Sequence, residues 1–229
     1  MDTGVVIVAA GTGKRMGAGR NKLWLPLGGK SILAHTVERF ATHPDIGEIV
    51  LVVHESDMSE VKAWLKHESY QVKLAIGGAE RQDSVRSGLA LLSEAISYVL
   101  VHDAARPFVT HEQISATISK VRTEDAVIMA VPVKDTIKIV NPTGIVEATP
   151  ARESLWAVQT PQAFRVSLLL KAHMEAYQAG KQGTDDAMLV EWLGYKVSVI
   201  PGSYENIKIT TPDDLWFGEE ILRRRRERE

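Results

Sequence analysis

The chain has 229 residues, of which 45% are hydrophobic and 24% charged, so it has the length and balance of one α/β domain or two small domains. Its formal net charge of −2 argues against an overall attraction to nucleic acid or to an anionic membrane, and its lack of cysteine excludes disulfide scaffolds, thiolate metal sites and cysteine nucleophiles. The sequence shows neither a signal-peptide pattern nor an apolar run long enough to cross a bilayer, so we expect a cytoplasmic protein.

Short apolar runs alternate along the chain with segments of helical periodicity. The apolar runs are nearly continuous in Val, Ile, Leu and Ala, which is typical of strands buried on both faces of a parallel sheet. The alternation predicts a doubly wound α/β fold with a mostly parallel, Rossmann-like sheet, and the absence of a linker or repeat predicts a single domain over 1–229. The predicted strands are 5–10, 48–53, 71–76, 98–103, 125–133 and 196–202; the predicted helices are 31–43, 58–67, 84–95 and 111–122.

The segment after the first predicted strand, AAGTGKRMGAGRNK (9–22), combines four glycines with four basic residues. It is not a Walker A loop, because Arg15 follows the Gly-Lys pair where that motif needs Ser or Thr. It is not a dinucleotide fingerprint either, because Met16 stands where the third glycine belongs. Small residues and fixed cations after a first strand nevertheless suit a polyphosphate. We predict a phosphate-binding loop, with a solvated basic turn as the alternative.

The segment 135–151 interrupts the alternation of strands and helices. Two alternating runs, DTIKIV and IVEATPA, flank the turn sequence NPTG, which predicts a two-stranded arm. Because an isolated hairpin is marginally stable in water, the arm is expected to pack on the main sheet or on a partner chain.

The end of the chain predicts a strand at 206–210 and then a helix capped by Thr211, with Pro212 in its first turn. The terminal RRRRERE suggests either polyanion binding or the solvated end of that helix, whose dipole favours cations there. We interpret it as the helix end.

Three further segments carry candidate site residues. Asp103 ends a predicted central strand, where it would face the ligand crevice and reach a metal ion or a substrate hydroxyl. Strand alternation turns Lys208 away from the neighbouring isoleucines, either toward the site or toward solvent. GGAERQDSV (77–85) is a second glycine-rich turn, able to pass under a base or simply to turn the chain. None of the seven histidines has metal-ligand spacing, and His102 is expected to end a strand rather than to act as a general base.

Together these segments resemble one family. The motifs AAGTGKRMG…NK, GGAERQDSV, HDAARPF, PVKDTIK, LWAVQTPQAF, GTDDA and ENIKIT occur in the order found in 2-C-methyl-D-erythritol 4-phosphate cytidylyltransferases, over about residues 4–217. Ribitol-5-phosphate cytidylyltransferases, and more distantly other sugar-phosphate nucleotidyltransferases, are the alternatives. The former tend to begin with AGG and to carry HDAVRPF, whereas this chain has AAG and HDAARPF, which favours the first family.

The resemblance implies transfer of CMP from CTP to 2-C-methyl-D-erythritol 4-phosphate, with Mg²⁺ as cofactor and a homodimer joined through the arm. It implies that Arg152 enters the partner's active site. The position of Asp103 at a strand end makes it the candidate metal contact. The catalytic residues would be Arg15, Lys22, Arg152 and Lys208. Nucleotide binding would use Ala9, Ala10, Gly11, Gly13, Lys14, Gly78, Arg81, Ser84 and Ala104. The sugar-phosphate pocket would use Asp103, Arg106, Thr136, Arg152, Thr160, Thr184 and Lys208.

Overall fold

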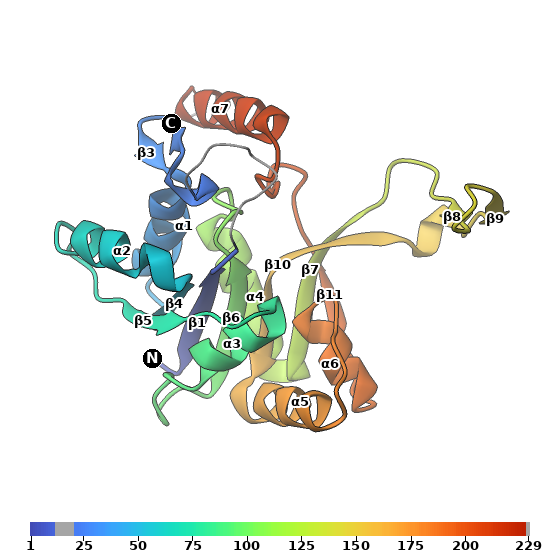
Figure 1. The fold of residues 1–229 in the computed structure, drawn as a ribbon, viewed down its shortest axis with the longest axis horizontal. Coiled ribbons are helices and arrows are strands. Elements are labelled where there is room, and N and C mark those ends of the chain that lie inside the picture. Colours follow the sequence, from blue (N-terminus) through green and yellow to red (C-terminus); the bar gives the residue numbers. More distant parts are fainter. Residues whose placement is uncertain (12–20, 228–229) are drawn as a thin grey trace.

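The computed structural model describes residues 1–11 and 21–227 and is built on a seven-stranded sheet (Figure 1). The strand order is β11-β7-β10-β6-β1-β4-β5. Every neighbouring pair is parallel except those made by β10, which runs antiparallel to β6 and to β7. The mostly parallel sheet that the sequence predicts is therefore confirmed. The strands are β1 (Thr3–Ala9), β4 (Ile46–Val53), β5 (Lys73–Ile76), β6 (Tyr98–Asp103), β7 (Ala126–Pro132), β10 (Trp156–Arg165) and β11 (Ser198–Pro201).

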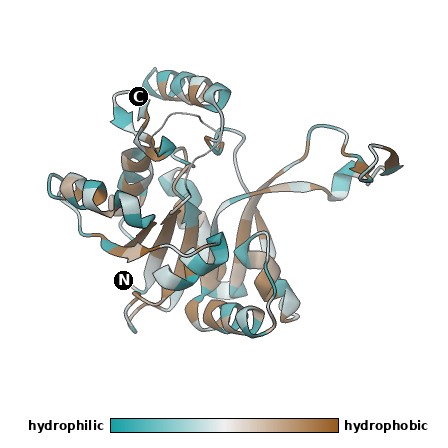
Figure 2. Ribbon diagram, viewed as in Figure 1, coloured by the Kyte–Doolittle hydropathy of each residue, from teal (hydrophilic) through white to brown (hydrophobic). Residues whose placement is uncertain are grey.

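Helices cover both faces of this sheet, and each face has its own apolar cluster. One cluster joins the sheet to α1, α2, α4 and α7, and the other joins it to α3, α5 and α6. The sheet strands are correspondingly rich in hydrophobic residues along their length (Figure 2). The helices are α1 (Ile32–Ala41), α2 (Met58–Leu65), α3 (Arg81–Leu89), α4 (His111–Glu124), α5 (Val166–Gln178), α6 (Asp186–Trp192) and α7 (Pro212–Arg226).

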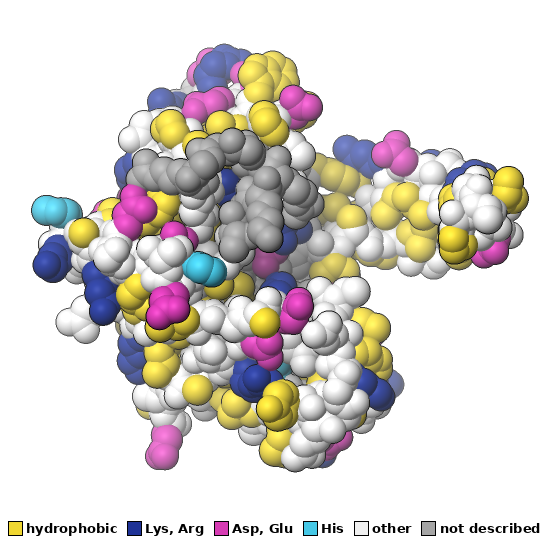
Figure 3. Space-filling view, viewed as in Figure 1, with side chains coloured by type: hydrophobic (Ala, Val, Ile, Leu, Met, Phe, Trp, Pro, Cys, Tyr) yellow, Lys and Arg dark blue, Asp and Glu magenta, His cyan; other side chains and the backbone are white. Residues whose placement is uncertain are grey.

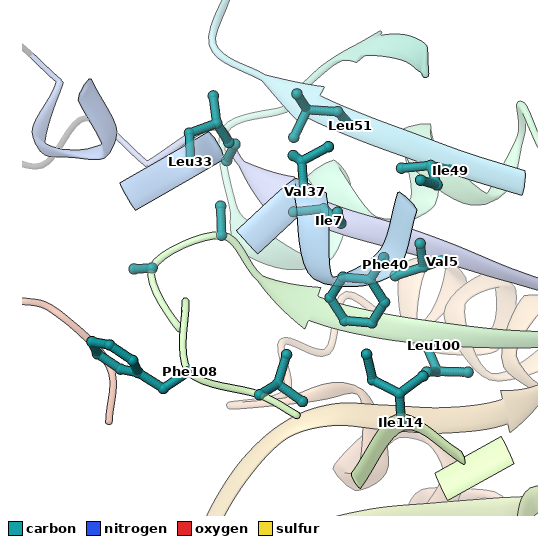
Figure 4. Close-up of a cluster of buried hydrophobic side chains, with 14 of the residues drawn as sticks. Val5, Ile7, Leu33, Val37, Phe40, Ile49, Leu51, Leu100, Phe108 and Ile114 are labelled. Atoms are coloured by element: carbon teal, nitrogen blue, oxygen red, sulfur yellow. The ribbon is translucent and has the colours of Figure 1, made fainter. Parts of the chain in front are cut away.

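The first cluster shows why the central strands read as continuous apolar runs. Val5 and Ile7 of β1 point to the face that carries α1, where Phe40 packs against them (Figure 4). Val6, between them, belongs to the cluster on the opposite face. Both faces of β1 are therefore buried, and each fully buried side chain of this size contributes about 1.5–3 kcal/mol to folding.

Short elements follow the glycine-rich segment in the chain. The 3-10 helix η2 (Lys22–Trp24) leads into a small hairpin of β2 (Pro26–Leu27) and β3 (Lys30–Ser31). Gly28 turns this hairpin with φ of +57°, and a Cβ there would meet the Leu222 side chain of α7 at 2.6 Å. The positive φ therefore favours glycine at this turn, and a larger residue would also displace the ends of the Leu222 and Arg226 side chains. Another 3-10 helix, η3 (Glu55–Asp57), precedes α2.

The two-stranded arm is separate from the main sheet (Figure 1). It pairs β8 (Ile139–Val140) with β9 (Val146–Ala148), so its strands are shorter than the sequence predicts. It projects from the body and exposes hydrophobic side chains (Figure 3): Ile137, Ile139, Val140, Ile145 and Val146. The 3-10 helix η4 (Arg152–Ser154) leads from the arm back to β10.

Several elements differ from the prediction. The strand β10 and the helices α5 and α6 are additional, and α3 begins three residues earlier than the predicted 84. The prediction of a strand at 206–210 is wrong. This segment lies outside the sheet, and the Ile209 amide donates a hydrogen bond to the Ala105 carbonyl at 2.8 Å. The helix after it is confirmed, with Thr211 as its N-cap and Pro212 in its first turn. Within the described ranges, no helix is long and apolar enough to cross a membrane.

Candidate active site

A cavity of about 390 Å³ opens at the carboxyl ends of β1 and β6. This is where ligands bind in open α/β sheets, and the volume falls within the usual range for small-molecule sites. Five segments converge on it: the end of β1, the start of η2, the turn into α3, the end of β6 with the residues after it, and the segment before α7. Its lining includes nine of the predicted residues, namely Ala9, Ala10, Gly11, Lys22, Gly78, Arg81, Ser84, Asp103 and Lys208.

Small residues bring the walls of the cavity close together. A Cβ on Gly77 would collide with Cβ of Ala10 and would lie 2.8 Å from Oγ of Ser84, so the turn before α3 can approach the end of β1 only as glycine. The Gly78 amide donates to Oγ of Ser84 at 3.2 Å, which fixes this turn at the start of α3. By contrast, a Cβ on Gly11 would meet no atom of the described residues within 4 Å. Gly77 is therefore required for packing, whereas no described residue crowds Gly11.

Asp103 is the centre of a charge cluster on the floor of the cavity. Its Oδ2 accepts from Nζ of Lys208 at 2.8 Å, and its Oδ1 accepts from Nε of Arg81 at 3.3 Å. Nε of Arg106 lies 3.9 Å from Oδ2. Burial by itself would raise the pKa of Asp103, but the charges of Arg81 and Lys208 outweigh it and hold that pKa well below its usual value. Asp103 is thus a fixed carboxylate rather than a proton donor.

Arg81 joins this cluster to a buried region beneath it. Its NH1 donates to Oδ2 of Asp186 at 2.6 Å, and Oδ1 of Asp186 lies 3.0 Å from Nε2 of His173. Burial opposes the charge of Arg81, yet Asp186 and Asp103 together raise its pKa. Sequence reasoning missed Asp186 and His173. Asp186 belongs to the GTDDA motif, but nothing local in the sequence pairs it with Arg81.

His102 lies on the same strand as Asp103 but takes no part in the cavity. Its Nε2 donates to the Arg106 carbonyl at 3.0 Å, and its Nδ1 accepts from the hydroxyl of Thr160 at 3.1 Å. That hydroxyl in turn accepts from the Asp103 amide at 3.0 Å. Burial lowers the pKa of His102 to about 4, so the ring is neutral at physiological pH. The prediction that His102 ends a strand and is not a base agrees with this position.

Lys22 reaches across the cavity from η2. Its Nζ donates to the Ile209 carbonyl at 2.7 Å, so it connects the segment after the glycine-rich loop to the segment that carries Lys208. The side chain of Asn21 caps η2 by accepting from the Leu23 amide, which fixes the backbone next to Lys22. Two lysines therefore reach one cavity from opposite ends of the chain.

Other predicted residues lie outside this cavity in the single chain. Ala104 and Thr160 are buried behind it, and Arg106 donates to the carbonyls of Asn206 and Val158. Thr136 and Arg152 are exposed at the base of the arm, where Arg152 donates to the Lys134 carbonyl at 3.1 Å. Thr184 is exposed beside Met188.

Three predicted residues, Gly13, Lys14 and Arg15, lie outside the described residues. Conversely, six residues line the cavity that were not assigned to the site from the sequence, although two of them lie within the motif GGAERQDSV. The six are Val8, Leu23, Ala79, Glu80, Ala105 and Thr210.

The described residues do not fit a metal ion held by the protein alone. Over 1–11 and 21–227, no three His, Cys, Asp or Glu residues are grouped as a metal site. Asp103, the predicted contact, already accepts from two cations through its two carboxylate oxygens. This donor set suits anion binding more than cation binding.

Comparison with known proteins agrees with this geometry. The family model of 2-C-methyl-D-erythritol 4-phosphate cytidylyltransferase (IspD) matches residues 3–224. A protein of that name from Bacillus velezensis is 51% identical over 226 residues, with 97% of each chain covered. Another from Alkaliphilus metalliredigens is 50% identical over 228 residues, with 98% of this chain and 95% of the relative covered.

Solved structures of the same class share the fold. The 4-diphosphocytidyl-2C-methyl-D-erythritol synthase of Anaerococcus prevotii superimposes with a TM-score of 0.87 at 33% identity, covering 96% of each chain. The 2-C-methyl-D-erythritol 4-phosphate cytidylyltransferase of Thermus thermophilus gives a TM-score of 0.80 at 32% identity, covering 97% of this chain and all of that one. The likeness therefore extends over nearly the whole length of the chain.

Proposed function

The chain belongs to the 2-C-methyl-D-erythritol 4-phosphate cytidylyltransferase family, and from this premise we propose how its residues perform the reaction. The enzyme transfers CMP from CTP to 2-C-methyl-D-erythritol 4-phosphate, releasing pyrophosphate and giving 4-diphosphocytidyl-2-C-methyl-D-erythritol, a step toward isoprenoid precursors. The observation that carries the proposal is the convergence of Lys22, Arg81 and Lys208 on one cavity at the strand ends. Such a cavity suits two polyanionic substrates.

The chemistry is an in-line substitution at the α-phosphorus of CTP. A phosphate oxygen of the acceptor forms the new bond, the bond to the β-phosphate oxygen breaks, and the electron pair leaves with pyrophosphate. Since the acceptor phosphate is already an anion near neutral pH, no residue has to remove a proton. This agrees with the surroundings of Asp103, which is held ionised by its cations, and with the neutral, buried His102.

Catalysis then consists of positioning and charge stabilisation. Lys22, together with Arg15 from the preceding loop, is proposed to stabilise the charge that develops on the α-phosphate oxygens. Lys208 is proposed to position the acceptor phosphate beside Asp103, and Asp103 to orient the acceptor. The small residues Ala9, Ala10 and Gly78 leave room for the cytidine against the backbone.

Mg²⁺ is proposed to enter with the triphosphate as part of the substrate, because Mg²⁺ commonly binds through substrate phosphates and few protein ligands. The engaged oxygens of Asp103 support this over a resident ion. CTP is a metabolite of the cytoplasm, which supports a cytoplasmic location for the enzyme.

We also propose that the arm joins two chains into a homodimer. Its exposed apolar residues and its separation from the main sheet support a partner of the same kind, since an isolated hairpin is marginally stable. Arg152, exposed where the arm returns to the body, would then act in the partner's site. Sedimentation of the wild type and of an Ile139→Asp variant tests the dimer, and the variant is expected to sediment as a monomer.

The experiment that tests the function is pyrophosphate release with CTP and Mg²⁺. One reaction contains 2-C-methyl-D-erythritol 4-phosphate and a parallel one contains ribitol 5-phosphate. Fast release is expected only in the first. Release only in the second would keep the mechanism and change the acceptor, and release in neither would overturn the proposal.

A further inference from the structure

Arg81 is held between two carboxylates that come from distant parts of the chain. Asp103 at the end of β6 accepts from Nε at 3.3 Å, and Asp186 at the start of α6 accepts from NH1 at 2.6 Å. The Arg81 side chain is 28% exposed and lines the cavity, whereas Asp186 is 1% exposed and does not. Two acceptors on different nitrogens fix both the position and the plane of a guanidinium, because its donors form a rigid fork.

Asp186 is in turn fixed by a buried histidine. His173 of α5 is 1% exposed, and its Nε2 donates to Oδ1 of Asp186 at 3.0 Å. Its Nδ1 is buried without a hydrogen-bond partner among the described residues. The ring therefore makes its one polar contact with Asp186. Burying a nitrogen without a partner lowers the stability of the folded state. We therefore look for a role of this ring in its contact with Asp186.

The mechanism proposed above uses neither residue directly. Asp186 nevertheless determines where Arg81 can lie. Without its carboxylate, Arg81 would keep a single anionic partner, Asp103, and would compete more strongly with Lys208 for it. A guanidinium displaced toward Asp103 would leave the position in which it lines the cavity.

We propose that Asp186, held by His173, is a positioning residue that fixes Arg81 for binding of the nucleotide. The pair acts through Arg81 and does not touch the substrate. The inference rests on the proposed function for the identity of the nucleotide, CTP, but its test is a binding measurement that does not require transfer.

The central test compares two adjacent aspartates of the same motif. Asp186→Asn keeps the shape of the side chain and removes the charge that faces Arg81. Asp185→Asn is the matched control, because Asp185 caps α6 and accepts from Gln162 without contacting Arg81. Asp186→Asn is expected to raise the Kd and the KM for CTP about tenfold or more with kcat changed far less, and the control is expected to leave these constants unchanged.

A double variant separates positioning from general destabilisation. If Asp186 acts through Arg81, the double variant of Arg81→Lys and Asp186→Asn loses less CTP affinity than the sum of the two single losses. Once Arg81 is replaced, the loss of the Asp186 charge has little further effect on CTP binding. Additive losses of affinity would overturn the proposal, because they would mean that Asp186 acts independently of Arg81.

His173 provides a second pair of variants. His173→Gln places an amide donor near the position of Nε2 and is expected to retain most of the CTP affinity. His173→Phe keeps a ring but removes the donor, and it is expected to weaken CTP binding as Asp186→Asn does. If Asp186→Asn fails to fold, the two His173 variants test the positioning role instead. Equal CTP affinity of His173→Gln and His173→Phe would overturn the proposal.

Calorimetric titration with CTP alone makes the two proposals separable. A wild type that binds CTP and transfers nothing to either acceptor would overturn the proposed function, while the positioning role would still be judged by the affinities of the variants. Normal transfer by the wild type and unchanged CTP affinity in a folded Asp186→Asn variant would overturn only the positioning role.

Discussion

Nζ of Lys208 lies 2.8 Å from Oδ2 of Asp103, so a lysine from the segment before α7 pairs with the carboxylate that ends a central strand. Arg81 and Arg106 flank the same carboxylate. Because Arg81 also pairs with Asp186, these three cations share two carboxylates, which leaves one positive charge in excess at the carboxyl ends of the strands. A phosphate arriving there meets cations that are already fixed in place, which reduces the reorganisation that binding requires.

Replacing Lys208 with alanine should remove a cation that contacts the acceptor phosphate. We expect Lys208→Ala to lower kcat/KM for 2-C-methyl-D-erythritol 4-phosphate about 10²-fold, in line with the loss of one preorganised charge contact. Pyrophosphate release under subsaturating acceptor measures this. Lys196→Ala, which removes an exposed lysine outside the cavity, serves as the control and should match the wild type.

A double variant asks whether Lys208 matters only as the counter-ion of Asp103. Lys208→Met combined with Asp103→Asn removes both charges, so no carboxylate is left unpaired. Because Lys208 is expected to contact substrate, the double variant should remain at least as slow as Lys208→Ala. Recovery of activity in the double variant would mean that the lysine serves the ion pair alone.

The buried His102 should make stability depend on pH. Burial lowers its pKa to about 4 from the usual 6.5, so between these pH values the unfolded chain binds a proton that the folded chain does not. The contribution of the neutral His102 to the stability of the folded state is therefore complete above about pH 6.5, and it is lost as the pH falls through about 4. The difference between the pKa of His102 in the folded and in the unfolded chain corresponds to about 3 kcal/mol of unfolding free energy.

Urea unfolding at intervals from about pH 7 to about pH 4 measures this loss. His102→Gln should be less stable than the wild type at neutral pH but should lose about 3 kcal/mol less over this interval. His67→Gln, which removes an exposed imidazole and leaves the surroundings of His102 intact, should follow the wild-type curve. Parallel curves for the wild type and His102→Gln would show that the proton is taken up elsewhere.

The arginines at the end of α7 should differ in their contribution to stability. Arg225 donates to the Phe108 carbonyl at 2.9 Å and pairs with Glu205 at 3.2 Å, so it ties the helix to two segments near the cavity. Among the described residues, Arg224 pairs with Glu220 of its own helix, and its side chain is 60% exposed. We expect Arg225→Ala to lower the unfolding free energy by about 1–2 kcal/mol and Arg224→Ala by less than about 0.5 kcal/mol. Equal losses of unfolding free energy in the two variants, measured by urea unfolding, would contradict the conclusion that Arg225 joins α7 to other segments.

Most of the sheet could be predicted from the sequence because its strands are buried on both faces. β1 and β6 read as unbroken apolar runs, and burial explains why. The strand β10 escaped prediction because Thr160 and Gln162 interrupt its apolar pattern, and both side chains are buried for a structural reason: each makes hydrogen bonds to other segments. The segment 206–210 has the alternation of a strand, yet it is bonded to the residues after β6, through the Ile209 amide and the Ala105 carbonyl, and not to an edge strand.

Site residues could be predicted where they directly follow a strand in the chain. Contacts between residues that are distant in the sequence could not be predicted. Asp103 and Gly11 were found because strand ends meet at one edge of the sheet. The pairing of Arg81 with Asp186 spans 105 residues, so no local pattern signals it. The tail arginines were interpreted as a solvated helix end, which holds for Arg224 but is wrong for Arg225, whose partners lie on other segments.

The proposed sharing of residues across the dimer can be tested by mixing two inactive variants. Lys22→Ala is expected to lower turnover about 10²–10³-fold, because Lys22 would stabilise the charge that develops on the α-phosphate. Arg152→Ala is expected to be impaired as well, because Arg152 would complete the site of the partner. Each variant alone leaves a defect in every site of its homodimer.

Mixed dimers behave differently if Arg152 acts in the partner's site. The site on the Arg152→Ala chain then has its own Lys22 and receives Arg152 from the Lys22→Ala chain, so it is intact. After subunits exchange at equal amounts, half of the dimers are mixed and one site in each is intact, which gives about a quarter of wild-type activity. If Arg152 served its own chain, every site would keep one defect and the mixture would stay as slow as its components. Pyrophosphate release before and after exchange therefore decides whether the arm carries Arg152 into the neighbouring site.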